Sequence, residues 1–408
     1  MSKNKTSSSQ KILIIGERFY PEEFLINDLA DEWSKSGYCV EVLTQNPSYP
    51  FGKVFKGFKN RLFQITYYNA IKIYRFYTVQ GYKTNKILKI LNYFHFALTG
   101  SIIALIIGHN YKKIFVYQTG PLTLAIPAVL LKIFYRKKLF IWIWDIWPDA
   151  VYSYGFKKTK MLSVFLDSLV KLVYRNSDVL FFSSPGFENR IKYYLSAEKR
   201  LIYAPNWIPE YITISPSVSP FRPVRVFTFA GNIGKVQNLE NVIIGFTKAR
   251  SYVPNIELHI LGDGSSLQDL EKIVKERNYE NIIFYGKKNI AEVNSYFEKS
   301  DVLIISLKED PLFELYIPSK FQVYLGTGKP VFCILNGTVR DLVKKHQIGL
   351  SSNPSDTEEI SQTFVRFTEL NENDLKIMKV NALNLLQNSF NREKIISTLT
   401  QTIWFPTT

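Results

Sequence analysis

The chain has 408 residues, of which 46% are hydrophobic and 21% charged, with two cysteines and a formal net charge of +16. This length exceeds one hydrophobic core, so two globular domains are expected, and the apolar content excludes a disordered chain. Two cysteines exclude a disulfide framework, and residues 1–10, expected to be a flexible tail, lack the apolar core of a signal peptide. A cytoplasmic protein is therefore expected.

Short apolar runs alternate with longer amphipathic segments along residues 11–205. Such runs are typical of parallel strands buried on both faces, and the segments between them have helical periodicity. The first domain is therefore predicted to be an α/β, Rossmann-like, doubly wound domain. Its predicted strands are KILIIG (11–16), CVEVLT (39–44), KIFVYQ (113–118), KLFIWIW (138–144) and DVLFFS (178–183).

The positive charge is confined to this first half of the chain. Residues 1–205 contain 29 Lys and Arg against 13 Asp and Glu, whereas residues 206–408 contain 22 of each kind. Residues 42–144 contain 15 basic side chains and no acidic one, interleaved with aromatic residues. A solvated basic face, a nucleic-acid surface and a surface that docks on anionic lipid all fit this pattern.

The segment 87–108, ILKILNYFHFALTGSIIALIIG, favours the membrane interpretation, because apolar material lies beside the charges. Lys89, Asn92 and His95 interrupt it, and the remaining apolar run is too short to span a bilayer. We expect a helix that is partly core and partly interfacial. The protein is thus predicted to associate peripherally with an anionic membrane surface at the inner face of the cell membrane, and not to bind nucleic acid.

The stretch PNWIPEYITISPSVSPFRP (205–223), with five prolines and small polar residues, predicts an extended linker over 206–222. Beyond it, residues 223–373 predict a second Rossmann-like domain, and two such domains imply a ligand cleft between them. The predicted strands of the second domain are RVFTFAG (225–231), IELHILG (256–262), NIIFYG (281–286), DVLIIS (301–306) and KPVFCIL (329–335).

Glycine-rich turns follow the first two strands of this second domain. Gly231 and Gly234 in AGNIGKVQN permit a tight turn in which backbone amides can approach an anion. Gly262 and Asp263 in LGDG form another turn before a helix. Both turns also fit a purely structural role, in which Asp263 only caps its turn.

The stretch IPSKFQVYLGTGKP (317–330) begins a short apolar helix after another strand. The start of a helix exposes unpaired N–H groups and a partial positive charge, which suit a phosphate, and Lys320 adds a cation. Alternatively, Ser319 is only an N-cap and Lys320 a solvated lysine of the first turn. The preceding loop carries three acids, Glu309, Asp310 and Glu314.

Seven blocks of the chain resemble, in order and spacing, the family 4 glycosyltransferases of the GT-B fold, in the branch that builds bacterial surface polysaccharides such as O-antigen, capsule or exopolysaccharide. The resemblance implies a metal-independent, hexosyltransferase-type enzyme that transfers a sugar from a UDP- or GDP-linked donor with retention. The acceptor, a lipid-linked glycan, would be held by the N-terminal domain, and residues 374–408 would be helices that pack back on that domain. The blocks are RFYPEEFLINDLADEWSKSGYCVEVLTQNPSYPFG (18–52), YQTGPLTLAIPAVLL, WDIWPD, APNW, AGNIGKVQNLENVI, LGDG and IPSKFQVYLGTGKPV.

The resemblance also implies roles for individual residues on the donor side. Lys320, Lys235 and the amides around Gly231, Asn232 and Ser319 would stabilise the charge on the leaving diphosphate. No cofactor besides the donor is expected, and no convincing Asp-x-Asp or His-rich metal set is evident. The remaining donor-binding candidates are Gly234, Gln237, Gly262, Asp263, Glu309, Asp310, Glu314, Pro318 and Gln322.

This sequence departs from the family pattern at several of these positions. Asn232 and Gln237 align with a phosphate-binding Arg and Lys of the family. The paired glutamates of the family fall on Leu315 and Val323, next to Glu314 and Gln322. Trp144 replaces the histidine that often precedes the aspartate, here Asp145.

Acceptor-side candidates follow the first two predicted strands. Glu22, Glu23 and Asn27 begin the first helix, where acids also complement the helix dipole, and Asn46 and Tyr49 follow the second strand. Glu23 is a candidate base, and it joins Asp145, Lys320 and Lys235 as the catalytic candidates.

Two functions remain open from the sequence. One is the active transferase, and the other is a catalytically weak or silent relative that binds nucleotide sugar or lipid-linked glycan as an assembly partner, suggested by Leu315, Val323 and Trp144. An oxidoreductase is disfavoured because neither domain has a dinucleotide fingerprint.

Overall fold

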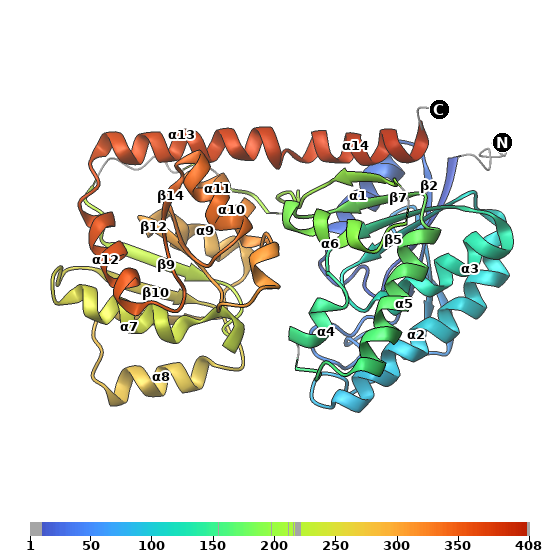
Figure 1. Ribbon diagram of the computed structural model, residues 1–408, viewed down its shortest axis with the longest axis horizontal. Coiled ribbons are helices and arrows are strands. Elements are labelled where there is room, and N and C mark those ends of the chain that lie inside the picture. The colour runs from blue at the N-terminus through green and yellow to red at the C-terminus, as the bar shows by residue number, and fades with distance from the viewer. Residues whose placement is uncertain are drawn as a thin grey trace. The chain divides into compact units, whose positions relative to one another are not determined.

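The computed structural model describes residues 10–405 except 154, 197, 211, 215 and 217–221, so most of the expected tail and part of the expected linker lie outside the described residues. The chain divides into two compact units (Figure 1). The first unit is formed by Met1–Ala204 together with Glu393–Thr408, and the second by Pro205–Arg392. Each unit is an α/β domain built on one sheet, which confirms the predicted fold class of two Rossmann-like domains.

The sheet of the first unit has eight strands in the order β3-β4-β2-β1-β5-β6-β7-β8. All neighbours are parallel except the edge pair β3 and β4. The winding reverses between β1 and β5, and parallel sheets bind ligands at such a switch point, beyond the carboxyl ends of the strands. The strands are β1 (Lys11–Ile15), β2 (Cys39–Gln45), β3 (Phe63–Tyr68), β4 (Ile71–Phe76), β5 (Lys113–Gln118), β6 (Lys138–Ile143), β7 (Val179–Phe182) and β8 (Arg200–Tyr203).

Helices cover both faces of this sheet. In Figure 1, α2, α3 and α5 group on one side, where α2 packs on α3 and α3 on α5, whereas α1 and α14 lie on the other side. Trp404 of α14 stacks on Tyr38 with ring centres 4.0 Å apart, and the indole N–H of Trp33 donates to Thr400 at 2.8 Å. The helices are α1 (Leu25–Lys35), α2 (Lys86–Ile107), α3 (Ile126–Tyr135), α4 (Asp149–Ser153), α5 (Lys160–Asn176), α6 (Glu188–Tyr193) and α14 (Arg392–Trp404).

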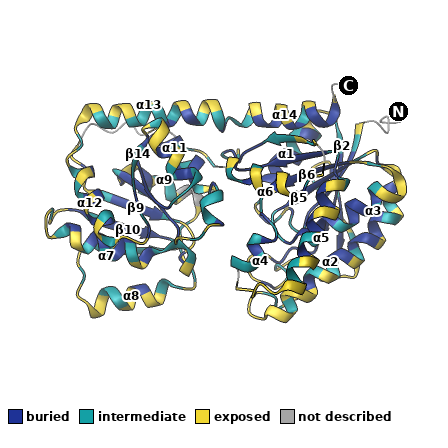
Figure 2. Ribbon diagram, in the orientation of Figure 1, coloured by how far each residue is buried: buried dark blue, intermediate teal, exposed yellow. Residues whose placement is uncertain are grey.

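Helix α2 confirms the predicted helix at 87–108, and it has one buried and one exposed face (Figure 2). On the buried face, the Asn92 side chain accepts hydrogen bonds from Gln45 at 3.0 Å and from the Val79 N–H at 3.1 Å. By length and composition alone, Lys86–Asn110 would be long enough to cross a membrane, with 25 residues and a mean hydropathy of 1.8. The apolar helix is therefore longer than the sequence predicted. Its Asn92 side chain is nevertheless hydrogen-bonded to other residues of the first unit.

The sheet of the second unit has six strands in the order β11-β10-β9-β12-β13-β14, all parallel, with its switch point between β9 and β12. The strands are β9 (Val226–Ala230), β10 (Glu257–Leu261), β11 (Ile282–Gly286), β12 (Val302–Ser306), β13 (Val331–Ile334) and β14 (Gly349–Ser352). The helices are α7 (Leu239–Arg250), α8 (Leu267–Glu276), α9 (Ile290–Lys299), α10 (Lys320–Thr327), α11 (Thr338–His346), α12 (Thr357–Thr368) and α13 (Glu372–Ser389).

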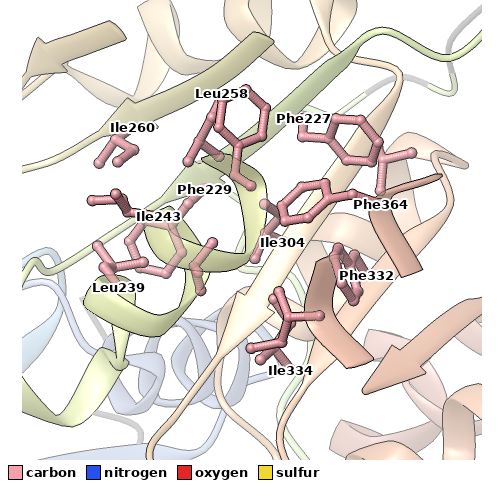
Figure 3. Close-up of a cluster of buried hydrophobic side chains, with 14 of the residues drawn as sticks. Phe227, Phe229, Leu239, Ile243, Leu258, Ile260, Ile304, Phe332, Ile334 and Phe364 are labelled. Carbon is pink, nitrogen blue, oxygen red and sulfur yellow. The ribbon is translucent and has the colours of Figure 1, made fainter. Parts of the chain in front are cut away.

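Phenylalanine and aliphatic side chains form the core beneath this sheet (Figure 3). Phe364 of α12 contacts Phe227 of β9 and Phe332 of β13 edge to face, with ring centres 4.7 and 4.9 Å apart. This arrangement is favourable for aromatic pairs and fills large volumes without polar atoms. The core therefore holds β9 and β13 rigidly, together with the loops at their ends.

All ten predicted strands are present, whereas β3, β4, β8 and β14 were not predicted. One other prediction needs correction. Helix α13 packs on α10 and α11 of the second unit, so only the part from 393 onward joins the first unit, not the whole of 374–408. Within the expected linker, Ile208 and Ile214 lie against Gly326, and the Asn294 side chain donates to the Thr213 carbonyl.

Candidate functional site

Two glycine loops press against each other at the carboxyl ends of β9 and β10. A Cβ placed on Gly262 would lie 1.8 Å from the carbonyl oxygen of Gly231, and one on Gly264 would lie 2.2 Å from that of Ile233. Hydrogen bonds from the Gly231 N–H to the Leu261 carbonyl and from the Ile233 N–H to the Asp263 carbonyl, both 2.9 Å, join the loops. The close approach leaves no room for a side chain, so glycine is required on steric grounds.

The ammonium group of Lys320, the first residue of α10, lies beneath this pair of loops. A Cβ on Gly231 would be 2.9 Å from Lys320 Nζ, and Nζ itself stands 3.8 Å from the centre of the Phe229 ring. Although the residue is only half-buried, Nζ is buried and has no hydrogen-bond partner among the described residues. Burial lowers the pKa of Lys320 from 10.5 to about 7. An uncompensated cation of this kind is costly unless an anion joins it.

The start of α10 adds backbone donors to the same place. Ser319 makes no side-chain capping hydrogen bond, which disagrees with the alternative that it serves only as an N-cap. The first N–H groups of a helix lack intrahelical partners and carry partial positive charge. Lys320 and the α10 N-terminus thus place an ammonium and the positive end of a helix close to Gly231, at the switch point of the sheet.

Gln237 shapes the loop that follows β9. Its side-chain oxygen accepts hydrogen bonds from the Gly234 N–H at 3.1 Å and from the Asn232 amide at 3.2 Å. Lys235 begins the short helical turn in this loop and is exposed to solvent. Asp263 accepts from the Gly264 N–H at 2.7 Å, in the manner of a turn cap. Gln237 and Asp263 therefore organise loops, whereas Lys235 extends outward.

The acidic loop after β12 is partly committed to internal contacts. Glu309 accepts a hydrogen bond from Ser355 at 2.6 Å, and Asp310 accepts one from the Leu312 N–H at 2.9 Å. The Lys308 N–H donates to the Val236 carbonyl at 2.8 Å, which joins this loop to the loop after β9. Glu314 lies in the short turn Phe313–Leu315, where its carbonyl contacts Gly337.

Two neighbouring residues of α10 have very different surroundings. Val323 is half-buried and packs on an apolar cluster that includes Phe321 and Tyr324. Gln322 is 1% exposed, and neither atom of its amide has a hydrogen-bond partner among the described residues. The position aligned with the family's glutamate is therefore part of a hydrophobic surface, and the amide beside it is the polar group with unused hydrogen-bonding capacity.

Three of the acceptor candidates in the first unit are engaged within their own domain. The Glu22 carboxylate is buried and accepts from the N–H groups of Ser48 at 2.8 Å and Tyr49 at 2.6 Å, and burial raises the pKa of this carboxyl. Asn27 donates to the Glu22 carbonyl at 2.6 Å, and Asn46 donates to the Arg61 carbonyl at 3.0 Å. These side chains hold loops in place.

The other two acceptor candidates are accessible. Glu23 is exposed, and Tyr49 is 39% exposed with the Arg18 guanidinium 3.8 Å from its ring centre. Arg18 thus orders the Tyr49 ring at the surface by a cation–π contact. Of the five acceptor candidates, Glu23 and Tyr49 are the ones with surface available to a ligand.

A group of polar atoms at the switch point of the first sheet was not anticipated. Gln118 ends β5, and its side-chain N–H₂ donates to the Asp145 carbonyl at 3.1 Å. Within the described part of the chain, several buried atoms near the ends of β1, β5 and β6 have no hydrogen-bond partner. They are Glu17 Oε2, Gln118 Oε1, Thr119 Oγ1, Thr123 Oγ1 and Trp144 Nε1. The sequence feature that could have indicated this group is the presence of polar residues directly after buried strands.

The described residues contain no group of three or more His, Cys, Asp or Glu side chains placed to hold a metal ion. A buried cation, the Lys320 ammonium, stands beside the glycine loops, 2.9 Å from a Cβ placed on Gly231. The second unit therefore offers a buried ammonium beside the start of a helix, an arrangement that suits an anion.

Comparison with known proteins relates this geometry to a family. Residues 214–384, less than half of the chain and within the second unit, match the family model described as "Glycosyl transferases group 1". The chain is 23% identical over 268 residues to a "Probable glycosyltransferase WbjE" of Pseudomonas aeruginosa, an alignment that covers 63% of this chain and 66% of that protein. The match therefore spans just under two thirds of the relative's length.

Solved structures show the fold of the whole chain. The sucrose-phosphate synthase of Thermosynechococcus elongatus superposes with a TM-score of 0.68 at 15% identity, covering 96% of this chain and 97% of that one. Anabaena Alr3699/HepE, solved in complex with UDP, superposes with a TM-score of 0.69 at 13% identity, covering 96% and 99%. The architecture is that of the GT-B fold.

Proposed function

We propose that this chain is a retaining, metal-independent glycosyltransferase that moves a hexosyl group from a UDP- or GDP-linked donor to a lipid-linked glycan in surface polysaccharide biosynthesis. The observation that carries the proposal is the buried Lys320 ammonium without a hydrogen-bond partner among the described residues, beneath Gly231. The family match of residues 214–384 and the UDP held by HepE support a nucleotide-sugar donor. Retention and the glycan acceptor rest on the resemblance of the sequence blocks.

The proposed chemistry places the leaving nucleoside diphosphate at Lys320 and the start of α10. Negative charge develops on that diphosphate as the glycosidic bond to the donor breaks, and preorganised donors stabilise it most effectively in a site with little water. The Lys320 ammonium is already desolvated, and the α10 N–H groups are fixed in direction. These groups can act on the diphosphate without a metal ion.

A silent relative is a second candidate, favoured by the environment of α10. Val323 packs on the hydrophobic cluster where the resemblance expects a ribose-binding glutamate. Val323 cannot supply the carboxylate that the resemblance expects at this position. In that case the site would hold a nucleotide sugar without turning it over.

We further propose that the first unit docks on the cytoplasmic face of a membrane. Its α2 exposes a row of apolar side chains, and the basic residues of 42–144 lie in the same unit. Each basic residue near an anionic leaflet contributes about 1 kcal/mol, so several would hold the protein at the surface. A cytoplasmic setting agrees with Cys39 and Cys333 as free thiols.

Incubation of the protein and bacterial membranes with radiolabelled nucleotide sugars tests the proposal. We expect label in a lipid fraction, a product with the anomeric configuration of the donor, and turnover that persists in EDTA. Lys320→Ala should lower turnover at least tenfold, whereas Lys272→Ala, on the exposed face of α8, should not. Binding of UDP without transfer or hydrolysis of any common donor would favour the silent relative.

A further inference from the structure

A largely apolar pocket of about 260 Å³ opens in the first unit between α2, the α4–α5 region and the loops after β5 and β6. Ala150, Leu166 and Leu169 are buried residues of its lining, whereas Phe94 and Phe165 are more than half exposed. A soluble protein rarely leaves large apolar side chains gathered in a concave surface unless a ligand covers them. The lining therefore suits an apolar ligand.

Basic groups stand beside this apolar lining. Lys86 and Lys89, on the first turns of α2, line the pocket, and both are exposed. Asp145 is the one acid of the lining, so its side chains carry a net positive charge. No acidic residue occurs from 42 to 144, the segment that supplies α2. The ligand that fits these features has an apolar part and an anionic group.

An exposed apolar ridge leads away from the pocket along α2. Ile90 and Phe94 line the pocket, and Leu98, Ile102 and Ile106 continue from them at intervals of four residues. These five side chains are between 37% and 67% exposed. Residues four apart lie on the same side of a helix, so the ridge runs for roughly 24 Å at 1.5 Å per residue. An extended hydrocarbon chain can follow it into the pocket.

We infer that this pocket binds the lipid phosphate of the acceptor, with the start of its hydrocarbon chain among Phe94, Phe165 and Leu166 and its phosphate at Lys86 and Lys89. The inference deepens the proposed function. It rests on that function, because only a glycosyltransferase would use the bound lipid phosphate as an acceptor. It differs from the expected acceptor side at Glu22, Asn27 and Asn46, whose polar groups hold loops instead.

Polar groups lie where the sugar of such an acceptor would follow. Thr123 and Asp145 line the pocket, and Thr123 Oγ1 is buried without a hydrogen-bond partner among the described residues. Gly120 also lines it and contacts Glu17 Oε2, a further buried atom without such a partner, because a Cβ on Gly120 would be 3.0 Å away. Sugar hydroxyls can both donate to and accept from these groups.

Three matched probes test the inference on the full-length protein. Decyl phosphate carries both an apolar chain and a phosphate, decanol carries the chain alone, and inorganic phosphate the charge alone. We expect saturable binding of decyl phosphate, below its micelle concentration, at least tenfold tighter than that of either other probe. Trp147 lines the pocket, so its fluorescence and calorimetry can both report binding. Equal binding of decanol and decyl phosphate would overturn the assignment of Lys86 and Lys89.

Matched variants locate the bound probe. Phe165→Asp should weaken decyl phosphate binding at least tenfold, whereas Leu172→Asp, also exposed on α5 but outside the pocket, should leave it within twofold. The double variant Lys86→Glu/Lys89→Glu should bind decyl phosphate no better than decanol. Lys53→Glu/Lys56→Glu makes the same change in net charge outside the pocket and should retain the preference. Equal losses in test and control variants would contradict the inference.

Three further outcomes distinguish this inference from binding of a bilayer lipid and from the proposed function. Anionic phospholipid vesicles that displace decyl phosphate completely would show that a bilayer phospholipid occupies the pocket, which overturns the acceptor assignment. If decyl phosphate fails to bind while UDP binds in a manner dependent on Lys320, the pocket inference fails and glycosyl transfer stands. If decyl phosphate binds and no nucleotide does, the proposed function fails instead.

Discussion

Lys320 Nζ lies 3.8 Å from the centre of the Phe229 ring, so the face of a core aromatic on β9 is the cation's close neighbour. Cation–π attraction is worth about 0.5–2 kcal/mol and offsets only part of the cost of desolvating an ammonium. The pKa of Lys320 is lowered to about 7 because the rest of the desolvation cost is not offset. The desolvated Lys320 ammonium therefore lowers stability in a way that an anion can relieve.

Replacement of Lys320 should weaken UDP binding and increase the free energy of unfolding. Lys320→Met should reduce UDP affinity at least tenfold, because a charge-assisted contact to the diphosphate is lost. The same variant should raise the free energy of unfolding by roughly 1–3 kcal/mol at pH 7, because an unpaired buried polar group is removed. Calorimetry and urea unfolding measure the two effects. Lys272→Met, on an exposed face of α8, serves as the control and should change neither.

The stability gain of Lys320→Met should depend on pH with a defined sign. The folded-state pKa of Lys320 is about 7 and its ordinary value is 10.5, so between these values the unfolded chain binds more protons and wild-type stability rises with pH. The advantage of the variant should be full below pH 7 and shrink toward pH 10.5. A constant advantage at pH 6.5 and 9.5 would contradict the burial of the ammonium.

Nucleotide binding should be coupled to proton uptake. At pH 8 the free protein holds Lys320 mainly in its neutral form, because its pKa is about 7, and a bound diphosphate raises that pKa. Binding of UDP should therefore take up as much as one proton, and affinity should fall as the pH rises from 7 to 9. Calorimetry in buffers of different ionisation enthalpy measures the uptake, which Lys320→Met should abolish.

The contact between the glycine loops predicts a strong effect of one methyl group. Gly262→Ala places its Cβ 1.8 Å from the Gly231 carbonyl oxygen at a φ of +139°, so the loops must separate. We expect a loss of more than about 2 kcal/mol in the free energy of unfolding and loss of UDP binding. Gly286→Ala is the matched control, because it has a positive φ of +66° but no neighbour within 4 Å. It should cost only about 1 kcal/mol and retain UDP binding.

The surroundings of Val323 decide whether a family carboxylate can be restored. Val323→Glu should lower the free energy of unfolding by about 1–3 kcal/mol, because a carboxylate would replace a side chain packed on an apolar cluster. Val323→Gln has similar size without charge and should cost less. Neither variant should tighten UDP binding, and tighter binding by the glutamate variant would show that the position reaches the donor.

The exposed ridge of α2 predicts membrane association that depends on both charge and apolar contact. The protein should float with anionic vesicles at low salt and less so at 0.5 M salt, because ions screen the basic residues. Leu98→Asp/Ile106→Asp should reduce flotation several-fold, whereas Leu62→Asp, which is 81% exposed elsewhere in the first unit, should not. Retention of the double variant on vesicles would exclude the ridge from the contact.

The fold was predictable from sequence where buried strands form continuous apolar runs. β1, β5 and β12 are continuous apolar runs, and their positions were predicted closely. The antiparallel edge strand β3 was not found, because FQITYY alternates between half-buried and exposed residues and lies in a polar stretch. β14, with the sequence GLSS, is too short and too polar to give a signal.

The candidate site was predictable in part. The glycine loops and Lys320 follow strand ends, which local sequence can show, and the structure brings Gly231, Gly262 and Lys320 together. Local sequence cannot show that the Lys320 ammonium turns inward over Phe229, because that depends on packing between β9 and α10. Nor can it show that Glu22 is engaged by the amides of Ser48 and Tyr49, 26 and 27 residues away.

The chain enters the second unit after Ala204 and leaves it at Arg392, so the second unit is a continuous segment inserted into the first. During synthesis the second unit can finish folding as soon as its own residues have emerged from the ribosome. The first unit must wait, because Trp404 of α14 covers Trp33 and Tyr38. Until α14 is made, these aromatic side chains lack the Trp404 ring, and apolar surface left exposed on a nascent domain favours aggregation.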